Sequence, residues 1–254
     1  MKILKNKNQK RKWWFFNVLV YQYERKIDIL PFTNRQSKAE KMTVTQNACD
    51  AELAQVLPTP YVEVSVYEKA LGLLNSGKRP LLMAFDLDYT IWPRDCDLNV
   101  RPPFFSYQDR VIDAFWRDAA AHKDVADLLG AIVDSGIKVA FLSRNPSYMA
   151  VESLLRACPM NSKKFGPEGK LWMALESRDY FHSYSSGGKG KGKDKHFAAL
   201  LQLTRVDFKE IIFFDDLAEN IEAATAQGST GILVSKATGL DMSAFTQGLN
   251  QWRA

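Results

Sequence analysis

A short apolar run that ends in acidic residues constrains this sequence most. Residues 81–85 are apolar, and the run stops at Asp86-Leu87-Asp88-Tyr89-Thr90. Such a run, bounded by polar residues, is typical of a strand buried on both faces of a parallel sheet. Ligands bind at the carboxyl ends of the strands in open sheets of this kind, which is where Asp86 and Asp88 would lie. The two carboxylates are two positions apart, so an extended backbone would point both the same way.

The Asp86–Asp88 pair taken alone has three interpretations. Like charges held close repel, and a hard cation such as Mg²⁺ would relieve the repulsion. One carboxyl could instead carry a proton and act as an acid or base. The pair could also be an ordinary aspartate-rich turn. The residues at the ends of the other predicted strands distinguish between these alternatives.

Strands alternate with helices over the rest of the chain. Further strands are expected at 137–142, 180–184, 211–214 and 232–234, and helices at 64–75, 124–135, 147–157, 194–203, 218–227 and 242–252. We expect Asp194 to cap the helix that it begins. This order predicts an α/β fold with a doubly wound, mainly parallel sheet. Only about 55 residues separate the first strand from Ser143, so the cap domain should be minimal or absent.

Polar residues close three of the predicted strands. These residues are Asp86 with Asp88, Ser143, and Asp215 with Asp216. In a parallel sheet all three ends meet at one edge, where four carboxylates without a cation would repel strongly. Mg²⁺ binds one or two carboxylates together with phosphate oxygens, so it would account for the cluster. The alternative for Asp215–Asp216 alone is a cap for the helix that follows.

The basic charge of the chain is confined to its beginning. Residues 1–41 carry a net charge of +8 and residues 42–254 a net charge of −3. The body of the protein is therefore not typical of nucleic-acid binding, and no nucleic-acid partner is required. An apolar stretch at 13–21 is far shorter than the roughly 20 residues that span a bilayer, so no transmembrane segment is expected. Next to basic residues, it could make weak contact with a membrane surface.

Cysteine usage suggests the compartment. The three cysteines, Cys49, Cys96 and Cys158, show no disulfide or zinc pattern. A reducing compartment, the cytoplasm, is expected. Mitochondrial import is the alternative, because no acidic residue precedes Glu24. Residues 1–41 are interpreted as a disordered extension or as sequence translated upstream of a start at Met42.

The chain resembles the haloacid dehalogenase (HAD) superfamily of phosphatases. More narrowly, it is similar to the magnesium-dependent phosphatase family, an acid phosphatase-like group of HAD subfamily IIIC. The matching motifs are Asp86-Leu87-Asp88-Tyr89-Thr90-Ile91-Trp92-Pro93, Pro102-Pro103-Phe104, Ser143-Arg144-Asn145, Lys193 with His196-Phe197, Phe213-Phe214-Asp215-Asp216 with Asn220, and Gln247-Gly248-Leu249. The match spans about residues 80–252. It implies a catalytic domain at 80–254, preceded by a lead-in segment with a short helix at 42–79.

The resemblance implies Mg²⁺-dependent phosphomonoester hydrolysis through an aspartyl-phosphate. Asp86 would be the nucleophile. Asp88 would protonate the leaving oxygen and then deprotonate the water, and its backbone carbonyl would contact the metal. Asp215 and Asp216 would complete the Mg²⁺ site with these two residues. Thr90 would brace the loop.

The resemblance also implies a set of phosphate contacts. Ser143 and Lys193 would bind the phosphate and balance its charge, and Leu87, Thr90 and Arg144 would lie beside it. Lys193 is chosen over Lys195 because Lys-x-x-His-Phe is the family spacing. The same stretch fits the phosphate-binding pattern G-x-x-x-x-G-K, but Asp194 stands where that motif needs Ser or Thr.

An open site suits two kinds of substrate. One is a phosphorylated protein side chain, phosphotyrosine included, and the other is a sugar phosphate. The aromatic residues of 102–107 are expected to form a rim that selects among them. The alternative function is a catalytically idle module that binds a phosphorylated partner on the same fold. That alternative predicts loss of Asp86 or Asp88, and both are present.

Overall fold

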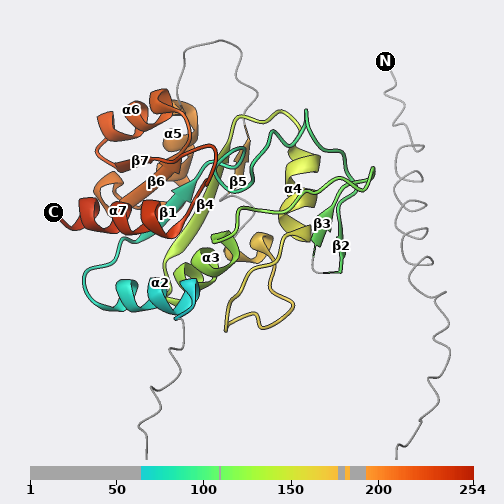
Figure 1. The fold of residues 1–254 in the computed structure, drawn as a ribbon. Coiled ribbons are helices and arrows are strands. Elements are labelled where there is room, and N and C mark those ends of the chain that lie inside the picture. Colours follow the sequence, from blue (N-terminus) through green and yellow to red (C-terminus); the bar gives the residue numbers. More distant parts are fainter. Residues whose placement is uncertain (1–63, 109, 177–180, 184–192) are drawn as a thin grey trace, which may run out of the picture. The chain divides into compact units, whose positions relative to one another are not determined.

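The computed structural model describes residues 64–108, 110–176, 181–183 and 193–254. The proposed extension at 1–41 and most of the lead-in segment lie outside the described residues. A five-stranded sheet with all neighbours parallel has the order β5-β4-β1-β6-β7 (Figure 1). Its strands are β1 (Leu82–Phe85), β4 (Lys138–Ser143), β5 (Phe181–Ser183), β6 (Ile211–Asp215) and β7 (Thr230–Leu233). All five expected strands are present.

Helices cover both faces of this sheet. They are α2 (Val66–Asn75), α3 (Val125–Asp134), α4 (Tyr148–Ala157), α5 (Asp194–Thr204), α6 (Ala218–Ala226) and α7 (Met242–Arg253). Alternate β1 residues divide between two apolar clusters: Met83 and Phe85 pack with α2, α3, α4 and α7, and Leu82 and Ala84 with α5 and α6. The predicted doubly wound α/β fold is therefore confirmed.

The central strand β1 is buried along its whole length. It pairs with β4 on one side and β6 on the other, with Phe85 opposite Phe141 and Phe214. The Phe85 and Phe214 rings stack with centroids 5.2 Å apart. Burial on both faces explains why the strand reads as an unbroken apolar run, and it fixes where the polar residues after Phe85 emerge.

The expected short helix before the sheet is α2. Ser65 caps it by accepting a hydrogen bond from the Glu68 N–H at 3.2 Å. Tyr67, Ala70 and Leu74 are buried in the same cluster as α3 and α7. The packed part of the chain thus reaches back at least to α2.

Two details differ from the sequence expectations. The stretch after Trp92, where no strand was expected, contains an antiparallel hairpin of β2 (Phe105–Tyr107) and β3 (Arg110–Ile112). Asp194 is the first residue of α5 rather than its cap, because Lys193 holds the cap position and makes no capping hydrogen bond with its side chain. Two short 3₁₀ turns occur as well, at Leu171–Ala174 and Phe208–Glu210. Among the described residues, no helix has the length and apolar character needed to cross a membrane.

Candidate active site

A tight turn at the carboxyl end of β1 presents Asp86. The Asp86 N–H donates to the Phe214 carbonyl at 2.9 Å, which continues the pairing with β6 by one residue. The N–H groups of Thr90 and Ile91 then fold back onto the Leu87 carbonyl, at 3.1 and 2.8 Å. Tyr89 adopts a left-handed backbone with φ of 63°. This turn reverses the chain and leaves the Asp86 side chain at the sheet edge.

Three carboxylates converge at this edge. One carboxylate oxygen from each of Asp86, Asp215 and Asp216 lies within 4.8 Å of the others. Asp215 is fully buried, and both of its oxygens accept from Asn220 Nδ2 at 2.9 Å. Asp216 is paired with Lys236 at 3.3 Å. Three of the four residues predicted to bind metal therefore meet at the carboxyl ends of β1 and β6.

Lys193 lies among these acids. Its side chain is fully buried and contacts Asp86, Asp215 at 2.8 Å and the Leu142 carbonyl. Lys195, two residues along α5, is exposed. The choice of Lys193 over Lys195 as the lysine of the site agrees with this geometry. Lys189 and Lys191 lie outside the described residues.

Burial governs the proton affinity of this cluster. It raises the pKa of Asp86 well above its usual value, and the Lys193 ammonium opposes that rise while Asp215 adds to it. Burial also raises the pKa of Asp216, helped by the charge of Asp215. Lys193 itself loses hydration on burial, but its ion pairs with Asp86 and Asp215 outweigh that loss and raise its pKa. The carboxylates of Asp86 and Asp216 therefore need nearby positive charge to stay ionised.

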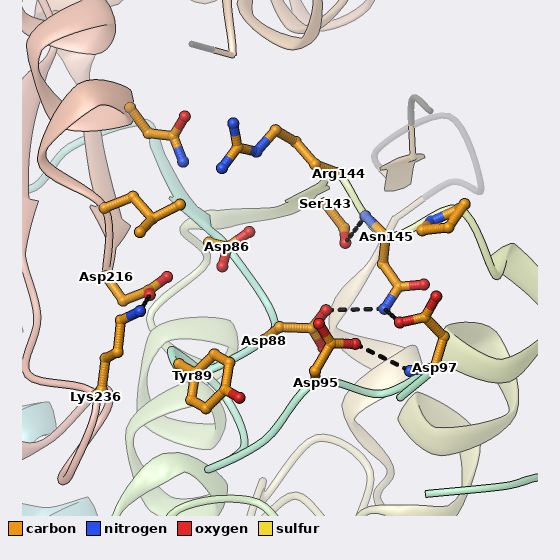
Figure 2. Close-up of a pocket in the computed structure, with 13 residues that line it drawn as sticks. Asp86, Asp88, Tyr89, Asp95, Asp97, Ser143, Arg144, Asn145, Asp216 and Lys236 are labelled. Carbon is orange, nitrogen blue, oxygen red and sulfur yellow. Dashed lines mark hydrogen bonds and ion pairs between the residues drawn. The ribbon is translucent and has the colours of Figure 1, made fainter. Parts of the chain in front are cut away.

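The Asp88 carboxylate is held apart from this cluster. Its Oδ1 accepts from Trp92 Nε1 at 2.7 Å and from the Cys96 N–H at 3.0 Å. Its Oδ2 accepts from Asn145 Nδ2 at 2.8 Å (Figure 2). Burial raises the pKa of Asp88, although these donors work against the rise. The grouped metal oxygens do not include the Asp88 side chain, so the predicted metal contact of Asp88 through its backbone carbonyl stays a prediction.

Ser143 ends β4 beside Asp86, as expected. It is buried, and its Oγ accepts from the Asn145 N–H at 3.0 Å. Its carbonyl oxygen lies 2.8 Å from His196 Nε2, which ties β4 to α5. Because a backbone N–H occupies one lone pair of Oγ, the hydroxyl proton can point at a ligand.

A cavity of about 250 Å³ opens over these side chains (Figure 2). Its lining residues are Asp86, Asp88, Tyr89, Asp95, Asp97, Ser143, Arg144, Asn145, Pro146, Asp216, Leu217, Asn220 and Lys236. Arg144 pairs with Glu219 at 2.8 Å at one side of the opening. The pKa of Asp97 is raised to about 6, first by its hydrogen bond with Asp95 and then by burial. Both basic and acidic side chains therefore line the opening of the cavity.

Three predicted contacts are not supported by these positions. Leu87 is fully buried in the apolar core, so only its backbone could meet a phosphate. Thr90 is fully buried too and does not line the cavity. None of residues 102–107 lines the cavity, because Phe104 packs into the core while Phe105 and Tyr107 face solvent. The expected aromatic rim is therefore wrong.

Several residues of the site had no predicted role. Asn145 donates to the carboxylate of Asp88, and Asn220 donates to that of Asp215. Both asparagines occur in the motifs noted above, so their positions could be found in the sequence. Asp95, Asp97 and Lys236 line the opening. Nothing in their sequence neighbourhood separates them from ordinary charged loop residues.

Comparison with known proteins assigns this site to a class. Residues 78–254 match the acid phosphatase family, and the chain belongs to that family. The chain is similar to human magnesium-dependent phosphatase 1, with 29% identity over 174 residues that cover 68% of this chain and 87% of the relative. A HAD-like hydrolase superfamily protein of Schizosaccharomyces pombe is 29% identical over 148 residues, or 56% and 79% of the two chains. The predicted family resemblance and the prediction of a phosphatase are confirmed.

Solved structures that resemble the chain in fold include the N-terminal part of protein BF1531 from Bacteroides fragilis, which contains a phosphatase domain and is complexed with Mg. The two share 18% identity with a TM-score of 0.43, over 72% of this chain and 43% of the other. CbbY of Rhodobacter sphaeroides, in complex with phosphate, shares 16% identity with a TM-score of 0.41, over 61% and 86%.

Proposed function

We propose that this phosphatase is a Mg²⁺-dependent phosphomonoester hydrolase that forms an aspartyl-phosphate on Asp86. One observation carries the proposal: Asp86 lines the cavity with Ser143, its carboxylate lies close to those of Asp215 and Asp216, and a fully buried Lys193 contacts both Asp86 and Asp215. A carboxylate alone is a weak nucleophile towards an anionic ester, so Asp86 needs charged groups close by, as this site provides.

The donor set fits Mg²⁺. The ion prefers oxygen ligands in octahedral geometry and keeps several waters, so it needs few carboxylates. Oxygens of Asp86, Asp215 and Asp216 lie close enough together to share one ion. Burial and the negative charge of Asp215 disfavour the ionised forms of Asp86 and Asp216, which a dication would restore. The name of the human relative, magnesium-dependent phosphatase 1, supports the same choice. When bound, Mg²⁺ would screen the repulsion between the nucleophile and the phosphate oxygens.

In the first step an Asp86 carboxylate oxygen bonds to phosphorus while the bond from phosphorus to the leaving oxygen breaks. Asp88 gives its carboxyl proton to the leaving oxygen, so an alcohol departs and Asp88 becomes a carboxylate. The Ser143 hydroxyl donates to a phosphoryl oxygen as charge shifts onto it, and Lys193, through its contact with Asp86, balances the negative charge at the nucleophile.

In the second step a water oxygen bonds to phosphorus and the bond from phosphorus to Asp86 breaks. The water proton passes to the Asp88 carboxylate, which restores the carboxyl group for the next turnover. Inorganic phosphate leaves, and Asp86 is again a free carboxylate.

The substrates that we propose are phosphorylated protein side chains, phosphotyrosine among them, or sugar phosphates. The cavity is open at the carboxyl ends of the strands, and the described residues between β1 and β4 form only loops, the β2–β3 hairpin and α3. Substrates larger than the cavity itself could therefore present a phosphate to Asp86.

Hydrolysis of p-nitrophenyl phosphate by the full chain tests the proposal. Activity should require Mg²⁺, disappear with EDTA and fall at least about 10³-fold in Asp86→Asn, because an amide cannot act as the nucleophile. Asp207→Asn, an exposed aspartate at the opposite end of β6, is the matched control and should keep full activity. Activity that survives Asp86→Asn would refute the assigned nucleophile.

A further inference from the structure

Asn145 makes hydrogen bonds within the site but takes no part in the proposed reaction steps. It follows Ser143 by two residues at the end of β4, and only 5% of it is exposed. Its Oδ1 accepts from the Ser147 N–H at 2.8 Å, and its Nδ2 donates to Asp88 Oδ2 at 2.8 Å. The same Nδ2 lies 3.4 Å from Asp97 Oδ1.

The chemistry of these partners fixes the orientation of the Asn145 amide. A backbone N–H can only donate, so the atom facing Ser147 must be the amide oxygen. The amide nitrogen then has to face the carboxylates of Asp88 and Asp97, and its two protons suit two acceptors. A flipped amide would set an oxygen against Asp88 and a nitrogen against a donor. The contact from Asn145 to Asp88 is therefore a directed hydrogen bond.

The two oxygens of Asp88 are not equivalent. Oδ1 receives two donors, from Trp92 and from the Cys96 N–H, and these use both of its lone pairs in the carboxylate plane. Oδ2 receives one donor among the described residues, Asn145, and keeps one lone pair. A proton on Asp88 therefore belongs on Oδ2, the oxygen that Asn145 orients.

We propose that Asn145 is a positioning residue, which holds Asp88 so that its Oδ2 delivers the proton to the leaving oxygen. This inference rests on the proposed function. As the ester bond to phosphorus breaks, the proton moves from Oδ2 to that oxygen, and its bonding electron pair stays on Asp88. The Asn145 N–H also donates to Ser143 Oγ, so one residue aligns both the proton donor and a phosphate-binding hydroxyl.

The role has a consequence that general support of the fold would not have. A nitrophenolate is a stable anion and departs without help, whereas an alkoxide needs a proton as it leaves. Without Asn145, Asp88 would lose its alignment, and alkyl esters should suffer far more than aryl esters. Because kcat/KM covers the steps up to release of the alcohol, it isolates this event from the later attack of water.

The experiment compares two substrates, p-nitrophenyl phosphate and glycerol 2-phosphate, with the full chain and saturating Mg²⁺. In Asn145→Ala we expect kcat/KM for glycerol 2-phosphate to fall about 100-fold and that for the aryl ester less than about 10-fold. Asn145→Ser removes the same donor with a smaller change in polarity and should show the same difference. Thermal unfolding identifies which variants are folded.

Asn220→Ala is the matched control, because Asn220 also holds a carboxylate of the site but contacts Asp215 instead. It should raise the Mg²⁺ concentration for half-maximal activity roughly 10-fold and reduce kcat/KM for both esters equally. Equal losses for both esters in the folded Asn145 variants would overturn the inference. An inactive wild-type protein would instead refute the proposed function, so the two failures are distinguishable.

Discussion

Replacing Lys193 by methionine is the sharpest test of how this site is stabilised. Lys193 is the cation between Asp86 and Asp215, and all three side chains are almost or completely buried. Methionine has a similar length and volume but carries no charge. The substitution would leave two carboxylates facing each other in a buried site, and it would leave the Leu142 carbonyl without this donor.

The expected cost follows from these contacts. Removing one partner of a buried ion pair typically costs about 3–5 kcal/mol, because the other charge stays buried without compensation. For a folded region of roughly 190 residues, each kcal/mol lowers the melting temperature by about 2–4 °C. Without metal, Lys193→Met should therefore melt roughly 6–20 °C below the wild type. Its activity should fall about 10²–10³-fold, because the cation that balances the charge on the nucleophile Asp86 is lost.

Mg²⁺ should restore part of the lost stability. A dication shared by Asp86, Asp215 and Asp216 would replace the missing positive charge, so Mg²⁺ should raise the melting temperature of the variant more than that of the wild type. The assay is thermal unfolding with EDTA and with Mg²⁺, together with phosphatase activity. It resolves the metal and the lysine as two sources of compensating charge.

Lys195→Met is the control for this test. It makes the same substitution two residues away, at an exposed position of α5, and should change the melting temperature by less than about 2 °C. Equal effects of the two substitutions would refute the assignment of Lys193 to the site. A stable Lys193→Met protein without metal would refute the electrostatic reasoning.

Two further predictions concern a buried carboxylate and a closely packed glycine. Asp113 is a buried carboxylate that accepts from three backbone N–H groups and from Arg117, and its pKa is lowered to about 2 because these donors outweigh the effect of burial. Asp113→Asn should cost about 2–3 kcal/mol at pH 7 in urea unfolding. The ionised form of Asp113 supplies this stability in full above about pH 4, and the stability is lost as the pH falls towards 2. The difference in free energy of unfolding between wild type and variant should therefore be smaller at pH 3 than at pH 7, and an unchanged difference would contradict this reasoning. Gly239→Ala places a Cβ 2.1 Å from His122 and 2.5 Å from the Thr90 carbonyl, at φ of 59°, and should cost about 3 kcal/mol. Gly136→Ala shares the positive φ but meets no atom within 4 Å, so it should cost only about 1 kcal/mol, and equal costs would rule out the clash.

Much of the fold could be predicted from periodicity and from strand ends. β1 and β6 are buried on both faces, so their apolar runs stop where the chain leaves the sheet. That one rule located Asp86, Ser143 and Asp215 together. Lys193 was chosen only through its spacing to His196, because its burial depends on where α5 begins.

The hairpin of β2 and β3 could not be predicted in the same way. Each strand has three residues, β2 is exposed throughout, and the turn uses Gln108 at φ of 46° rather than glycine or asparagine. Neither alternation nor turn chemistry marks such a hairpin. The links from Asn145 to Asp88 and from Asn220 to Asp215 were also missed as interactions. Both depend on side chains meeting across loops, which no sequence period encodes.

The central place of β1 in the sheet has a consequence during synthesis. β1 is made first, but its neighbour β6 begins about 125 residues after β1 ends. At about 5–20 residues per second, the ribosome needs roughly 6–25 s to supply that partner. Through this interval a wholly apolar strand has an unpaired edge, which favours aggregation. The strand that leads to Asp86 thus lacks one of its two neighbours until most of the sheet has been made.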